Sequence, residues 1–119
     1  MLQTSSHRYH LTRAAVFGLV LAAGGSVGRA QEAVTIQLSI KDHRFQPTEV
    51  RAPANQPLVL RIKNLDPTPE EFESRTLRVE KVVSGGSEIT IQIRPLNPGR
   101  YRFYGDYHED TADGALIAE

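Results

Sequence analysis

The chain has 119 residues, of which 14 are Lys or Arg and 14 are Asp or Glu, so its formal net charge is zero. That length favours a single domain. The chain contains no cysteine, which excludes disulfide frameworks, thiolate nucleophiles, zinc-thiolate sites and iron–sulfur clusters. Any metal site must therefore use His, Asp, Glu or backbone oxygen.

Residues 1–30 are predicted to be a cleavable signal peptide. A basic start is followed by an apolar run over residues 14–23, which is too short to cross a bilayer comfortably. Gly28 and Ala30 are the small residues that a signal peptidase requires, so we expect cleavage after Ala30. The mature domain would then comprise residues 31–119 and be periplasmic. An uncleaved N-terminal anchor is the alternative.

Removal of that segment would leave an acidic domain, because the segment holds three of the basic residues and none of the acids. The net charge of the remainder is 11 − 14 = −3. Such a surface offers no basic face to replace phosphate counterions, so no nucleic acid partner is expected. The sequence also lacks Gly-x-Ser-x-Gly, His-Glu-x-x-His and a Gly-rich phosphate loop, which argues against a hydrolase. No catalytic residue is assigned.

Apolar and polar residues alternate through most of the predicted mature domain, which indicates half-buried strands. The alternation runs through residues 34–41, 58–63, 77–79, 89–94 and 101–104. Turn signals rich in Pro and Gly separate these runs. About seven short strands without helical periodicity predict an all-β fold, a Greek-key antiparallel β-sandwich.

Several stretches of this alternating region resemble bacterial cupredoxins. Residues 40–47 contain a Phe-x-Pro strand start, and residues 59–64 form a hydrophobic strand that ends in Asn64. Residues 98–104, Pro-Gly-Arg-Tyr-Arg-Phe-Tyr, are similar to the strand that delivers the cysteine loop in that family. The resemblance covers nearly all of residues 34–119 and implies a cupredoxin-like fold.

Only one of the family's four copper ligands is retained. Glu70 or Glu71 stands where the family places its first histidine, since the register is uncertain by one residue. Gly105 stands at the cysteine, His108 matches the second histidine, and no methionine lies between His108 and Gly114. Blue-copper chemistry needs the thiolate, so it is not expected here.

Acidic residues crowd the same two loops around the retained histidine. They are Glu70, Glu71, Glu73, Asp106, Glu109, Asp110 and Asp113. Carboxylates with one imidazole suit iron or manganese better than cuprous copper. We predict His108, Glu70 or Glu71, and Asp106 as metal ligands, with water completing the shell. Asp106 is preferred because, on an extended loop start, side chains two residues apart project the same way.

Structural explanations of these residues remain open. His108 would then be a loop histidine bonded to a neighbouring acid, and the glutamates would be solvated loop charges. Asp113 is more simply explained by turn chemistry. His43 is expected to be a partly buried or surface histidine without a ligand role.

The two acidic loops also resemble a subgroup of cupredoxin-like periplasmic proteins associated with bacterial ferrous iron uptake. That resemblance implies binding of ferrous iron, with oxidation left open, before passage to a membrane iron permease and alongside a periplasmic iron-binding protein. Two other functions stay open. One is a docking subunit of a periplasmic transport complex that binds no metal, and the other is a copper-binding protein.

Overall fold

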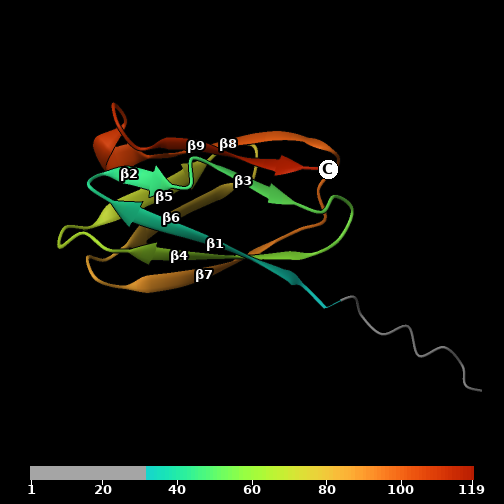
Figure 1. Cartoon of the computed structure of the whole chain (residues 1–119), viewed down its shortest axis with the longest axis horizontal. Coiled ribbons are helices and arrows are strands. Elements are labelled where there is room, and N and C mark those ends of the chain that lie inside the picture. Colours follow the sequence, from blue (N-terminus) through green and yellow to red (C-terminus); the bar gives the residue numbers. More distant parts are fainter. Residues whose placement is uncertain (1–31) are drawn as a thin grey trace, which may run out of the picture.

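The structure, a computed structural model, describes residues 32–119, so the predicted signal peptide lies outside the described residues. The described chain forms nine strands and one 3-10 helix (Figure 1). In order these are β1 (Val34–Lys41), β2 (Arg44–Gln46), β3 (Glu49–Ala52), β4 (Leu58–Asn64), β5 (Glu70–Ser74), β6 (Val79–Val83), β7 (Glu88–Ile93), β8 (Gly99–Gly105), η1 (Asp106–His108) and β9 (Asp113–Ala118). Among these residues, no helix has the length and apolar character needed to cross a membrane.

The strands form two sheets that pack into a sandwich, which confirms the predicted fold class. One sheet has the order β2-β1-β4-β7, and the other has the order β3-β9-β8-β5-β6. Two details differ from the expectation. Nine strands replace about seven. The alternating runs miss β2 and β3, which are short, and also β5 and β9, whose sequences EEFES and DGALIA do not alternate. The pairings β1–β4 and β3–β9 are parallel, because the chain crosses to the other sheet between β2 and β3 and then returns.

Three phenylalanines pack together inside the sandwich. Phe45, Phe72 and Phe103 are at most 1% exposed. Phe45 meets Phe72 and Phe103 edge to face, with ring centroids 5.9 and 4.9 Å apart. Such pairs add about 0.5–1.5 kcal/mol each beyond the burial of their area. Phe45 and Phe72 lie two residues after His43 and Glu70, and Phe103 lies two residues before Gly105. The cluster therefore anchors the segments that carry these three residues.

The hairpin that joins β1 to β2 turns through only two residues. Asp42 and His43 have φ values of 52° and 55°, and strand residues Lys41 and Arg44 pair directly. Positive φ at both central residues is the pattern of a type I′ turn, which most often contains Asn-Gly. Here neither residue is glycine, so contacts from elsewhere must stabilise the turn.

Candidate metal centre

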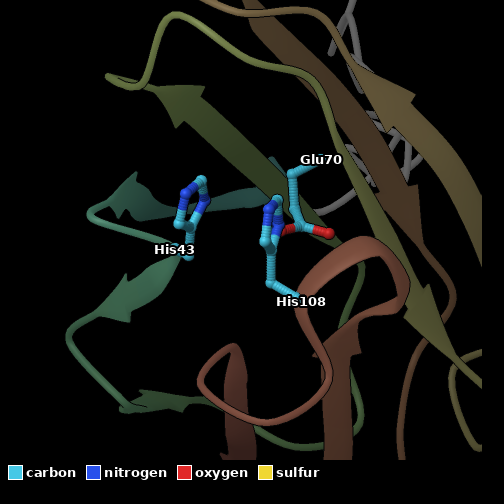
Figure 2. A group of neighbouring side chains, drawn as sticks. All are labelled: His43, Glu70 and His108. Carbon is cyan, nitrogen blue, oxygen red and sulfur yellow. The ribbon is translucent and has the colours of Figure 1, made fainter.

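Three potential ligands converge at one end of the sandwich. His43, Glu70 and His108 each offer a donor atom, and these atoms all lie within 4.8 Å of one another. His43 comes from the β1–β2 turn, Glu70 begins β5, and His108 ends η1. Figure 2 shows the two imidazole rings side by side, with the carboxylate against the ring of His108. The cluster therefore collects side chains from three separate segments and from both sheets.

Glu70 is the buried member of this cluster, with 1% of its surface exposed. Its Oε1 accepts hydrogen bonds from the backbone N–H of Glu71 and Tyr107, at 3.1 and 3.0 Å. Its Oε2 lies 2.5 Å from Nδ1 of His108. A buried carboxylate is costly unless it is hydrogen-bonded, and these three partners meet that requirement. The carboxylate is consequently fixed in one position beside His108.

Gly105, the last residue of β8, makes room for this carboxylate. A Cβ atom at position 105 would lie 2.5 Å from Cδ and 2.7 Å from Oε1 of Glu70. It would also lie 2.7 Å from the Cβ of Ala112. Real Cβ atoms essentially never come this close to other heavy atoms, so the carboxylate occupies space that any other residue at 105 would fill.

The two imidazoles are stacked, with centroids 3.6 Å apart and planes inclined by 15°. Thr111 Oγ1 donates a 2.6 Å hydrogen bond to the carbonyl of His43, and the backbone N–H of Ala112 donates to the carbonyl of His108 at 2.8 Å. The first bond ties the β1–β2 turn to the segment after η1, and the second closes the turn that follows His108. The side chains of His43 and His108 are 43% and 27% exposed, so an ion has access to them from solvent.

Asp66, in the loop between β4 and β5, supports the turn that carries His43. Its two carboxylate oxygens accept hydrogen bonds from the backbone N–H of Asp42 and His43, at 2.8 and 2.9 Å. Burial opposes ionisation of Asp66, but these two N–H donors and the nearby rings of His43 and His108 outweigh it, so its pKa is lowered. Asp66 is thus suited to remain a carboxylate, which is the form that holds the turn.

The four predicted ligands fall into two groups. Glu70 and His108 lie together, whereas Glu71 and Asp106 belong to a separate cluster with Glu73. Alternation along β5 explains the first separation, because neighbouring strand residues face opposite sides. The second arises because residues 106–108 form a 3-10 helix instead of the expected extended loop. With three residues per turn, side chains two apart diverge.

The second cluster, Glu71, Glu73 and Asp106, lies outside the buried centre. Partial burial raises the pKa of Glu71, and the hydrogen bond and negative charge of Glu80 raise it further, followed by the charges of Asp106 and Glu73. Mutual repulsion therefore characterises this group of acids. Asp113, expected to serve the turn, pairs with Arg102 at 2.8 Å.

His43 was expected to have no ligand role, yet it lies against His108. The signal that could have located it is the gap of two residues between the alternating runs that end at Lys41 and begin at Arg44. Such a gap is typical of a tight hairpin. It would have placed His43 at a hairpin tip, although not next to His108, because that contact depends on tertiary packing.

Comparison with known proteins identifies the family. The cupredoxin-like domain matches residues 14–118. An uncharacterized protein of Rickettsia prowazekii, RP394, is 45% identical over 82 residues, which cover 69% of this chain and 66% of that protein. The chain thus spans slightly less than two thirds of that relative.

Solved structures with the same fold include copper proteins. Auracyanin A of Chloroflexus aurantiacus, described as a "blue" copper protein, matches with a TM-score of 0.62 at 14% identity, over 73% of this chain and 99% of that one. The metal-binding domain of the Streptococcus pneumoniae Cu(I)-exporting ATPase CopA gives 0.63 at 14% identity, covering 71% and 84%. Amicyanin of Paracoccus versutus gives 0.55 at 16%, covering 75% and 83%. This chain belongs to the cupredoxin-like domain family.

Proposed function

We propose that the protein binds ferrous iron in the periplasm at the His43–Glu70–His108 cluster and passes it to a membrane iron permease. The observation that carries this proposal is the convergence of two imidazoles and one carboxylate within 4.8 Å. Two histidines and one carboxylate with open positions are the donor set typical of non-haem ferrous sites. Water would complete the coordination shell.

The absence of sulfur donors from the described cluster separates this centre from a blue-copper site. A blue-copper centre needs a cysteine thiolate with two histidines, and the chain contains no cysteine. Its single methionine is Met1, which lies in the predicted signal peptide. The remaining donors are harder, so they suit iron better than cuprous copper.

Metal binding at this cluster would displace a proton. Nδ1 of His108 and Oε2 of Glu70 lie 2.5 Å apart, within hydrogen-bond distance of one another. An ion held by both of these atoms would replace the hydrogen between them, so uptake through Nδ1 and Oε2 would be stronger at higher pH. The anionic oxygen of Glu70 would also stabilise the ferric state relative to the ferrous state. Loss of one electron to dioxygen or to a partner protein is then favoured.

The test is an anaerobic titration of purified residues 31–119 with ferrous iron, cuprous and cupric copper, and manganese, followed by air with a ferrous chelator present. Saturable one-to-one ferrous binding that is lost in His108→Asn supports the proposal. Faster loss of chelatable ferrous iron than in buffer alone would add oxidase activity. No saturable binding of any metal would refute it and favour a docking subunit without a metal.

Copper is the second candidate ion, and one observation favours it. The centre contains two histidines rather than the one expected from the sequence, and imidazole suits copper as well as iron. The structural neighbours auracyanin A and the CopA domain are also copper proteins by their descriptions. Tighter cupric than ferrous binding in the same titration would select this function.

A further inference from the structure

We propose that Gly105 is a specificity-determining residue of the metal centre. By lacking a side chain, it leaves the space beside His108 to the carboxylate of Glu70, so the anionic donor there is oxygen instead of a group carried by β8. This inference rests on the proposed metal binding at the His43–Glu70–His108 cluster, and it concerns how that cluster selects its ion.

The backbone does not explain the glycine. Gly105 has φ −94° and ψ 110°, an extended conformation that any residue adopts. Gly99, at the other end of the same strand, would place a Cβ no closer than 3.7 Å to its neighbours. At Gly105 the same atom would lie 2.5 Å from Glu70 Cδ. Space, and not conformation, therefore requires glycine at position 105.

The carboxylate of Glu70 can make room for a side chain at 105 only by giving up its hydrogen bonds. Its Oε1 is held by the backbone N–H of Glu71 and Tyr107, and its Oε2 by His108. Without these partners the Glu70 carboxylate would be a buried charge with no hydrogen bonds, which is strongly unfavourable. A side chain at position 105 and the carboxylate of Glu70 therefore exclude each other.

The two alternatives have different metal preferences. The cupredoxin resemblance places a cysteine at position 105, and a thiolate there is a soft donor that selects copper. The Glu70 carboxylate is a hard donor, which favours iron or manganese. The space beside His108 accepts either a thiolate at position 105 or the Glu70 carboxylate, but not both. Glycine at 105 together with Glu70 would therefore select an oxygen donor over a sulfur donor.

The first experiment measures this exclusion as thermodynamic coupling in metal-free protein. Gly105→Ala is made with Glu70 present and with Glu70→Ala, in an Ala112→Gly background that removes the other close contact. We expect Gly105→Ala to lower the midpoint of thermal unfolding markedly with Glu70 and much less with Glu70→Ala. The matched control, Gly99→Ala, should have the same small effect in both. Equal effects of Gly105→Ala in both would overturn the proposal.

The second experiment measures metal preference. In the Ala112→Gly background, Gly105→Ala should lower ferrous affinity by at least about tenfold while the protein stays folded, because the Glu70 carboxylate is pushed away from His108. The triple variant Gly105→Cys, Glu70→Ala, Ala112→Gly should gain an intense visible thiolate-to-copper charge-transfer band with cupric ion, which the wild type lacks. If Gly105→Ala in that background stays folded and binds ferrous iron as tightly as Ala112→Gly alone, the role of Gly105 is overturned.

The two proposals fail in distinguishable ways. If the wild type binds no ferrous iron but the unfolding coupling and the thiolate–copper band both appear, the iron function fails and the exclusion stands. If the wild type binds ferrous iron and the coupling is absent, the iron function stands and the role of Gly105 fails.

Discussion

Asp66 determines the position of His43 through the backbone. Its carboxylate accepts a 2.9 Å hydrogen bond from the N–H of His43 and a 2.8 Å bond from that of Asp42. Left-handed backbone costs a residue other than glycine about 1–2 kcal/mol, and both turn residues adopt it. The loop after β4 thus fixes a proposed ligand, His43, that the β1–β2 hairpin carries.

Replacing Asp66 by alanine should weaken both the fold and the metal centre. The loss of two hydrogen bonds to a charged acceptor is expected to lower the free energy of unfolding by about 3 kcal/mol. Ferrous affinity should fall by about tenfold, as is typical when a supporting group is removed. Urea unfolding and anaerobic titration measure the two effects. Asp42→Gly, which keeps both bonds and relaxes the turn, is the control and should retain wild-type affinity.

His43→Ala should reduce ferrous affinity by about a hundredfold, which corresponds to about 2.7 kcal/mol, because a direct ligand is removed. The side chain of His43 is 43% exposed, so the unfolding midpoint of the metal-free protein should change little. Titration and thermal unfolding of His43→Ala and His108→Ala, side by side, provide the check. Unchanged affinity in His43→Ala would restrict the centre to Glu70 and His108.

Asn64→Ala should destabilise the protein by about 3 kcal/mol. The side chain of Asn64 is fully buried; its Nδ2 donates to the carbonyls of Thr68 and Val83, and its Oδ1 accepts from the N–H of Asp66. Removal would take the amide away from two buried bonds, to the Val83 carbonyl and the Asp66 N–H, and from one part-buried bond to the Thr68 carbonyl. Chemical denaturation measures the loss, and an effect below about 1 kcal/mol would show that water replaces the amide.

Glu49→Gln should make the stability of the fold less dependent on pH at acid pH. The hydrogen bond from Arg100, together with its charge, lowers the pKa of Glu49 below its ordinary value of 4.5. The unfolded chain therefore binds more protons between the lowered pKa and 4.5, so this contribution to stability is present above 4.5 and is lost as pH falls through the folded pKa. Thermal unfolding of both proteins from pH 3 to pH 7 should show curves that converge at the acid end. The difference at neutral pH should be small because the pair is exposed.

Much of the architecture could be predicted from the sequence, and the site only in part. Alternation over residues 34–41 and 58–63 indicates directly which strand face is buried, so the β-sandwich could be predicted from the sequence. Glu70 and His108 could be identified as site residues because their loops resemble the copper loops of cupredoxins. The position of His43 could not be predicted, because it depends on a tight turn held by Asp66, which is distant in sequence. The direction of Asp106 could not be predicted either, since a 3-10 turn replaces an extended segment.

The origin of the three proposed ligands in different sheets has a mechanical consequence. His43 belongs to a hairpin of the β2-β1-β4-β7 sheet, whereas Glu70 and His108 belong to strands and loops of the other sheet. A bound ion would therefore link the two sheets at the end of the sandwich where these residues lie. Its binding free energy would add to the stability of the folded state. If the proposed ion binds there, the β1–β2 hairpin should resist proteolysis more in the metal-bound protein than in the metal-free protein.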